Sequence, residues 1–290
     1  MSGEAAFIDA LRAIARSPEA RGLADDAAVI ELGGEALVLT HDMMVEGVHF
    51  LTEQDMADVA WKLVAVNLSD LAAKGARPLG VLLGYTLGAG DARFLAGLRK
   101  VLAAYDVPLL GGDTVSGGPP RSFGLTAIGR ATHRPVPARG GAQPGDGLWL
   151  TGPVGAAMLG FEAMQGGSTA DTAAYRRPTP LLEQGQALAP VVSAMMDVSD
   201  GVLLDASRMA AASGVAIAIE TAAVPLAVPE SRRADALRWG DDYQLLFTLP
   251  GDTEPPVEAW RIGTVREPGE AHLLIDGAPP ASGDRLGYSH

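Results

Sequence analysis

The feature that most restricts the fold is a proline- and glycine-rich stretch in the middle of the chain, residues 133–147 (HRPVPARGGAQPGDG). Such a composition is typical of loops and linkers. On both sides of it, short apolar runs typical of strands alternate with segments of helical periodicity. The sequence therefore predicts an α/β protein with two domains of similar size, residues 1–134 and 135–290.

The pattern also predicts the individual elements. Helices are expected near residues 4–16, 55–74, 91–105, 154–165 and 180–188, and from Gly201 toward Ala212. Strands are expected near residues 27–32, 35–41, 79–87, 107–112, 122–131, 148–151, 194–198, 215–220 and 243–249. The polar segment 166–175 (GGSTADTAAY) is expected to be mobile and is a candidate lid. No short repeat is present, which excludes solenoids and propellers.

Composition excludes several classes of function. The 290 residues contain no cysteine, so thiolate nucleophiles, zinc–cysteine sites and iron–sulfur clusters are excluded. The first residues lack the apolar centre of a signal peptide, and no apolar run reaches membrane-spanning length. The net charge of −13 disfavours nucleic acid and anionic membranes as partners. We therefore expect a cytoplasmic protein that binds neither.

Acidic residues recur at the ends of apolar segments or next to glycines, where the backbone turns and side chains can meet in a cleft. They are Asp25, Asp26, Asp42, Asp70, Asp113, Asp197, Asp200, Asp241 and Asp242. Solvated surface charge is seldom placed in this way. The recurrence favours one shared acidic site.

Each acid also has an ordinary structural explanation. Asp70 could pair with Lys74 one helical turn later. In AMMDVSDG, residues 194–201, Ser199 or Asp200 could cap the following helix. The acids beside glycines could be loop residues. Taken singly these explanations are at least as good, and only their conjunction favours a site.

Carboxylates brought together without cations would repel one another and have raised pKa values. Hard oxygen ligands select Mg²⁺, Mn²⁺ or Ca²⁺ over zinc or copper, and the five histidines show no zinc-binding spacing. Magnesium commonly accompanies phosphates. Neither GxxxxGK[ST] nor a helix-linked GxGxxG is present, so a nucleotide would have to bind on an uncommon scaffold.

Seven motifs, taken in order, closely resemble the thiamine-monophosphate kinase family. They are ADDAAV, THDMMVEGVHF, VNLSDLAAKGARP, LLGGDT, RGGAQPGD, DVSDGV and GDDYQL, and the resemblance runs from Phe7 to the terminal GYSH. That family belongs to a superfamily with aminoimidazole ribonucleotide synthetase, selenophosphate synthetase and a hydrogenase-maturation protein. The order of seven motifs makes the resemblance far more specific than any one of them.

The resemblance implies an α/β fold with mixed sheets, like that of aminoimidazole ribonucleotide synthetase, and a homodimer formed through the N-terminal sheets. It implies ATP as co-substrate and several Mg²⁺ ions. The expected metal ligands are Asp26, Thr40, His41, Asp42, Asp70, Asp113, Asp197 and Asp200. The expected ATP contacts are Gly112, Asp113, Arg139 and Ser199, and the expected substrate contacts are His49, Asp241 and Tyr288.

The implied reaction is in-line transfer of the γ-phosphoryl group of ATP to thiamine monophosphate. The attacking phosphate oxygen is already anionic at neutral pH, so positioning and charge neutralisation matter more than a general base. The residues expected to carry the catalysis are Asp113, Asp197, Asp200 and Arg139.

Some positions depart from the family pattern. Ala24 stands where a glycine is expected, His41 replaces a hydroxyl residue, and the usual GGEDYEL reads WGDDYQL, with Asp241 in place of Glu. The two superfamily enzymes that need a reactive cysteine or selenocysteine are disfavoured. A related enzyme that uses another phosphorylated acceptor, or a non-catalytic nucleotide-binding descendant, remains an alternative.

Overall fold

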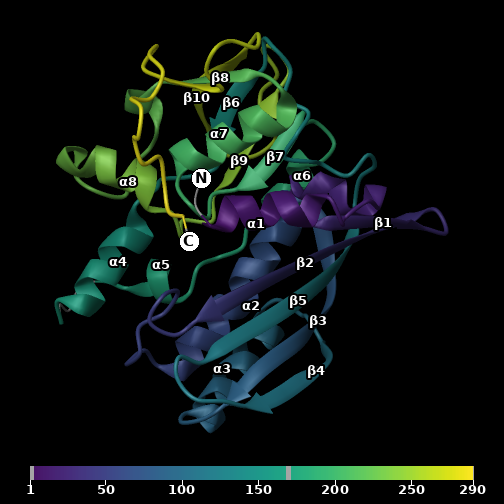
Figure 1. Ribbon diagram of the computed structural model, residues 1–290, viewed down its shortest axis with the longest axis vertical. Coiled ribbons are helices and arrows are strands. Elements are labelled where there is room, and N and C mark those ends of the chain that lie inside the picture. Colours follow the sequence, from purple (N-terminus) through teal and green to yellow (C-terminus); the bar gives the residue numbers. More distant parts are fainter. Residues whose placement is uncertain (1–2, 168–170, 290) are drawn as a thin grey trace.

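The computed structural model describes residues 3–167 and 171–289, and it folds into two sheet-based halves (Figure 1). The first half holds a five-stranded sheet in the order β1-β2-β5-β3-β4. Its strands are β1 (Ala28–Leu32), β2 (Glu35–Val45), β3 (Ala76–Leu87), β4 (Leu109–Ser116) and β5 (Ser122–Ala131). Its helices are α1 (Gly3–Arg12), η1 (Pro18–Leu23), α2 (Met56–Ala73) and α3 (Asp91–Ala104).

The second half holds a six-stranded mixed sheet in the order β11-β8-β10-β6-β9-β7. Its strands are β6 (Gly147–Leu150), β7 (Ala194–Asp197), β8 (Ala216–Ile219), β9 (Leu245–Leu249), β10 (Trp260–Arg266) and β11 (Leu273–Ile275). The α-helices are α4 (Ala156–Gln165), α5 (Ala173–Arg176), α6 (Leu182–Leu188), α7 (Val202–Ser213) and α8 (Arg233–Trp239). Two short 3-10 helices are η2 (Thr221–Ala223) and η3 (Glu230–Arg232).

Helix α2 joins the two halves. It packs on one face of the first sheet, beside α3, and its last turn contributes Ala72 and Ala73 to a core shared with β7 and β9. Almost every residue of α2 is buried, which explains why its apolar residues are spread around the helix rather than confined to one face. A side chain at Gly185 of α6 would place its Cβ 2.0 Å from the Ala72 carbonyl oxygen, so glycine permits this close approach.

The face of the first sheet opposite α2 and α3 is open to solvent in the described chain (Figure 1). Paired residues in neighbouring strands point to the same face of a sheet. The row Met43, Gly124, Gly84 and Asp113 crosses β2, β5, β3 and β4, and Met43 is 53% exposed. Asp113 therefore lies on the open face.

Most of the predicted elements are present. The strand expected near 122–131 and the helix expected near 55–74 match β5 and α2 within a residue. The helix expected near 4–16 ends earlier, at Arg12, and α8, β10 and β11 were not predicted. The first sheet ends at Ala131 and the second begins at Gly147, while the boundary at 134/135 stays a prediction. No helix in the described ranges is long and apolar enough to cross a membrane.

Candidate functional site

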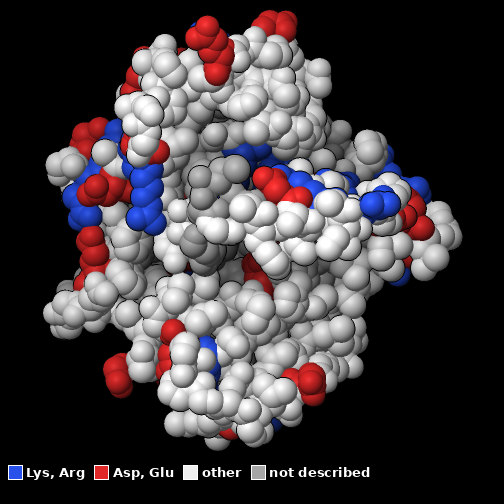
Figure 2. Space-filling model, in the orientation of Figure 1, with Lys and Arg blue, Asp and Glu red and all other residues white. Residues whose placement is uncertain are grey.

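A cleft of about 1070 Å³ lies between the two halves and is lined by residues of both. Figure 2 shows acidic atoms on the floor of this hollow. The predicted site residues that line it are Asp26, Asp42, His49, Asp70, Arg139, Asp197, Ser199, Asp200, Asp241 and Tyr288. The fold thus gathers side chains that are up to 262 positions apart in the sequence, as the numbers of Asp26 and Tyr288 show.

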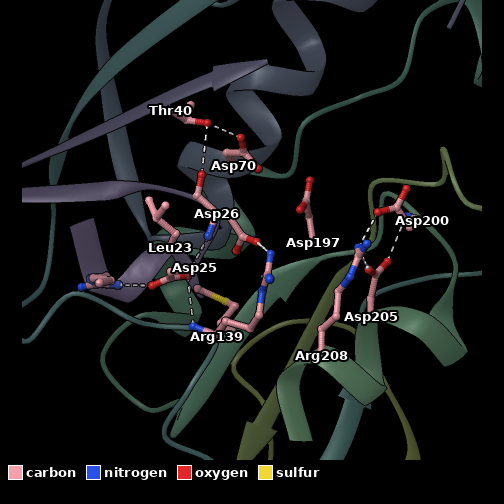
Figure 3. Close-up of polar contacts among 12 residues, drawn as sticks. Leu23, Asp25, Asp26, Thr40, Asp70, Arg139, Asp197, Asp200, Asp205 and Arg208 are labelled. Atoms are coloured by element: carbon pink, nitrogen blue, oxygen red, sulfur yellow. Dashed lines mark hydrogen bonds and ion pairs between the residues drawn. The ribbon is translucent and has the colours of Figure 1, made fainter. Parts of the chain in front are cut away.

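Three buried carboxylates form the centre of the cleft (Figure 3). One ligand oxygen from each of Asp26, Asp70 and Asp197 lies within 4.8 Å of the other two. Asp26 precedes β1, Asp70 lies near the end of α2, and Asp197 is the last residue of β7. Oxygens at this separation can share cations between them.

Neighbouring hydroxyl groups orient two of these carboxylates. The Thr40 hydroxyl donates to Asp70, and the Ser69 hydroxyl donates to Asp197. Thr40, on β2, and Ser69, on α2, are both buried. The predicted ligand Thr40 therefore lies behind the carboxylates, hydrogen-bonded to one of them.

Lys74 provides a buried positive charge on one side of the cluster. Its ammonium Nζ lies 2.7 Å from Asp26 Oδ2, forms an ion pair with Asp25, and donates to the Met195 carbonyl oxygen at 3.2 Å. Burial lowers the pKa of Lys74, but the two aspartates outweigh that effect and raise it. The alternative pairing of Asp70 with Lys74 is wrong, since Lys74 turns to the acids at the start of the chain.

The carboxylates that lack such a cation have raised pKa values. Burial, reinforced by Asp42, Asp197 and Asp26, raises the pKa of Asp70 well above its ordinary value. Burial likewise raises the pKa of Asp197 to about 8 and that of Asp42 to about 6. Burial also acts on Asp26, but Lys74 and Arg139 outweigh it and lower the pKa of Asp26 to about 2.

The donor set fits a hard divalent cation. All the donors are carboxylate oxygens, with no cysteine in the chain and no histidine in the three-residue cluster. Although Asp26 Oδ2 is ion-paired with Lys74, it accepts no hydrogen bond of normal geometry within the described residues. Bound cations would offset the burial of Asp70 and Asp197, which raises their pKa values, and the repulsion between the carboxylates, which adds to it.

Asp200 lies beyond the cluster, beside Arg208 (Figure 3). Arg208 Nη1 donates to Asp200 and, at 3.0 Å, to Asp205 Oδ1. Asp205 in turn accepts a 3.0 Å bond from the Asp200 backbone N–H. The alternative explanation, a cap by Ser199 or Asp200, is wrong: α7 starts after Gly201 without a side-chain cap, and Asp205 of the helix binds back to the preceding loop.

A second wall of the cleft carries the residues predicted to bind substrate. Asp241 Oδ2 lies 2.7 Å from Lys62 Nζ, and Asp241 Oδ1 accepts a 2.9 Å bond from the Tyr243 hydroxyl. Lys62 also donates to the His49 carbonyl oxygen at 3.2 Å. Tyr288 is held there by its backbone N–H, which donates to the Asp200 carbonyl oxygen at 2.9 Å.

Three predicted ligands lie elsewhere in this chain. His41 is exposed on the open face of the first sheet, where its Nδ1 lies 2.8 Å from Thr126 Oγ1. Gly112 and Asp113 lie on the exposed edge strand β4 and do not line the cleft. Their predicted roles in binding metal and ATP stay predictions.

Several contributors were missed in the sequence. Lys62 was not considered, and Lys74 was considered only as a partner of Asp70; both are buried lysines in a helical stretch that is mostly apolar. A charged residue rarely occupies such a position unless it is paired, which is the signal that could have found them. The sequence around Arg208 shows no comparable signal, because its pairing with Asp200 and Asp205 is known only from the fold.

The predicted lid segment is partly described. Residues 168–170 lie outside the described residues. After them, Arg176 Nη1 and Arg177 Nε each lie 2.5 Å from a carboxylate oxygen of Asp58 on α2. Both arginines thus tie the α5 segment to α2.

Known proteins resemble the chain over most of its length. Residues 24–131 match the N-terminal domain, and residues 143–275 the C-terminal domain, of AIR synthase related protein. Thiamine-monophosphate kinase of Caulobacter vibrioides is 39% identical over 272 residues, 86% of this chain and 76% of that protein. Its counterpart in Aquifex aeolicus is 31% identical over 297 residues, 95% and 94% of the two chains.

A solved structure gives the same result. AaThiL complexed with AMPPCP and TMP superposes with a TM-score of 0.87 at 28% identity and covers 96% of this chain and 95% of its own. These similarities confirm the predicted two-domain fold with mixed sheets.

Proposed function

The chain belongs to the thiamine-monophosphate kinase family, and we propose that it transfers the γ-phosphoryl group of ATP to thiamine monophosphate, giving thiamine diphosphate and ADP. The observation that carries this proposal is the group of buried carboxylates in a cleft between two domains. The similar structure that holds AMPPCP, an ATP analogue, together with TMP supports both ligands. A need for ATP also favours the predicted location in the cytoplasm.

Asp26, Asp70 and Asp197 would hold Mg²⁺, with Asp42 and Asp200 beside them. When bound, the ions supply charge neutralisation for the phosphates. The pKa of Asp197, which burial raises to about 8, supports this assignment, because such a group binds a proton at neutral pH unless a cation takes its place.

The protein's own contribution to the reaction is to position the reactants and to supply positive charge. Arg139 lines the cleft, and its buried Nε has no hydrogen-bond partner in the described chain. The side chain is 19% exposed, so a guanidinium N–H that reaches the cleft can bind a phosphate oxygen. Arg208, which bridges Asp200 and Asp205, adds a second guanidinium to the cleft wall. The acceptor phosphate is already anionic, so no strong base is needed.

We also propose that the protein is a homodimer formed through the open face of the first sheet. Apolar side chains on and beside this face are exposed, including Met43 at 53%, Leu82 at 38% and Leu110 at 55%. An exposed edge strand such as β4 is a further site for pairing. Because Asp113 faces away from the cleft of its own chain, its predicted metal and ATP contacts require a second chain.

A product assay tests the proposed function. Purified protein is incubated with ATP, magnesium and thiamine monophosphate, and thiamine diphosphate is measured by chromatography. Formation of the product in proportion to enzyme is expected. ATP binding without turnover would instead favour the non-catalytic descendant, and turnover only with another phosphorylated acceptor would indicate a related enzyme.

A further inference from the structure

Lys62 is a buried cation that the proposed chemistry does not use. Its side chain is 2% exposed, and its ammonium has three partners in the second wall of the cleft. Nζ lies 2.7 Å from Asp241 Oδ2, 3.2 Å from the His49 carbonyl oxygen and 4.1 Å from the centre of the Tyr175 ring. The three partners come from three different segments, so Lys62 ties together the wall that surrounds Asp241.

Stability alone does not explain this arrangement. Burying an ion pair costs desolvation, and well-packed apolar residues often stabilise a protein as much or more. Helix α2 is otherwise rich in buried apolar residues, which an additional leucine or methionine would match. We therefore relate the Lys62 ammonium to the role of Asp241 rather than to the packing of α2.

Asp241 is held in place from several directions. Its φ is +59° and that of Tyr243 is +51°, a left-handed conformation that is uncommon outside glycine and that a bulky residue such as Tyr243 adopts only with support from its surroundings. The Asp241 backbone N–H donates to the Ser199 carbonyl oxygen at 2.8 Å. One side-chain oxygen is bound by Tyr243 and the other by Lys62, yet 28% of the side chain stays exposed to the cleft.

The electrostatic consequence concerns what Asp241 can bind. A carboxylate has about four acceptor positions, and two of them are used by Tyr243 and Lys62. The ammonium 2.7 Å away balances its negative charge. The remaining positions therefore suit an uncharged N–H donor better than a cation.

We propose that Lys62 is a positioning residue that sets substrate selectivity: it fixes and neutralises the Asp241 carboxylate so that this group accepts a hydrogen bond from the uncharged amino group of the substrate's pyrimidine ring. The inference rests on the proposed function, because thiamine monophosphate carries such an aminopyrimidine. Lys62 does not touch the reacting phosphates and acts only through Asp241.

The test compares two acceptors. In oxythiamine monophosphate a carbonyl oxygen replaces the amino group, so it would face the Asp241 oxygens without a proton to share. The ratio of kcat/KM for thiamine monophosphate to that for oxythiamine monophosphate is measured for the wild type and for Lys62→Met. Lys100→Met, at an exposed position on α3, is the matched control.

We expect Lys62→Met to lower this selectivity ratio by about tenfold or more, mainly through a higher KM for thiamine monophosphate, with the KM for ATP unchanged. Asp241→Asn should also lower the ratio, and the double variant should add little, because the two side chains act as one unit. Lys100→Met should leave the ratio unchanged.

The outcomes distinguish a failure of the proposed function from a failure of the inference about Lys62. A wild type without thiamine diphosphate formation overturns the proposed function, and the inference falls with it. An active wild type in which Lys62→Met lowers kcat/KM for both acceptors in equal proportion overturns the inference alone and assigns Lys62 a structural role. If Lys62→Met does not fold, Lys62→Gln, which keeps a polar head group without the charge, is judged by the same ratio.

Discussion

Two neighbouring aspartates in the cleft have pKa values shifted in opposite directions, although burial raises both. Asp26 has Lys74 and Arg139 beside it, and its pKa falls to about 2. Asp197 is buried without such a cation, so burial, reinforced by neighbouring carboxylates, raises its pKa to about 8. The same residue type can thus be a fixed charge or a proton-binding group, depending on which cations lie within reach.

The raised pKa of Asp197 predicts how stability depends on pH without magnesium. An unfolded aspartate has a pKa of about 3.9, so between that value and about 8 the folded protein binds more protons than the unfolded chain. The free energy of unfolding should therefore decrease as pH rises from about 4 to 8. Thermal unfolding in the presence of a chelator measures this slope.

Two comparisons make the pH experiment specific. Asp197→Asn should flatten the decrease, because the titrating group is gone. Added magnesium should reduce it as well, since bound ions replace the protons. A wild-type Tm that rises steadily across this window in chelator would contradict the assignment of Asp197 as a buried acid without its own cation.

Asp200 should be needed for turnover but not for folding. Its side chain is 24% exposed, so Asp200→Asn buries no new polar group. Mutation of a residue that only supports a metal ligand commonly lowers metal affinity or activity about 10–100-fold. Asp200 is predicted to be a direct ligand, so its loss should lower kcat by at least about 100-fold. Product formation and circular dichroism measure the two effects. Asp252→Asn, at an exposed loop position, is the control, and wild-type turnover by Asp200→Asn would exclude the ligand role.

At the scale of elements, α2 brings most of the wall residues together. Asp58, Lys62, Ser69 and the following Lys74 bind partners in α5, the loop before β9, β7 and the loop after η1, respectively. Local periodicity predicted the helix well, because its apolar run is long. Local periodicity could not reveal these partners, because they are distant in the sequence. Asp25 is 49 positions from Lys74, and Asp241 is 179 positions from Lys62.

The elements that the sequence did not predict are short or charged. Helix α8 has 7 residues, which is too few for a periodic signal. Strand β10 begins and ends among exposed charged residues and is recognised only from its pairing with β6 and β8. In the site, the carboxylates at element ends were visible in the sequence, whereas the cations that set their pKa values were not.

The α5 segment should loosen when its anchor on α2 is removed. The Asp58 side chain is 2% exposed and binds Arg176 and Arg177, so Asp58→Ala removes both ion pairs. Because both arginines are partly exposed, we expect the free energy of local opening to fall by only about 1 kcal/mol. Hydrogen exchange across residues 171–177 measures this change.

Glu183→Ala, at an exposed position on α6, is the control for this experiment and should leave that exchange unaltered. Faster exchange in the control as well, or no change in Asp58→Ala, would show that the anchor does not hold the segment.

At the scale of the whole molecule, the open face of the first sheet predicts self-association. We expect light scattering to give the mass of a dimer. A charge on β4, as in Leu110→Lys, should produce monomers because it places an ammonium in the apolar contact. Leu95→Lys, on α3 and 58% exposed, is the matched control and should stay dimeric. A wild type that is monomeric at micromolar concentration would contradict the dimer.

The central claim is that this acidic chain, with a net charge of −13, binds an anionic nucleotide through divalent cations held by Asp26, Asp70 and Asp197. The most direct measurement is anomalous diffraction from crystals grown with Mn²⁺ and AMPPCP. The account predicts manganese peaks about 2.0–2.3 Å from oxygens of all three carboxylates, with the phosphates of the analogue on the far side of the ions. Nucleotide bound in the cleft with no anomalous peak among these oxygens would contradict it.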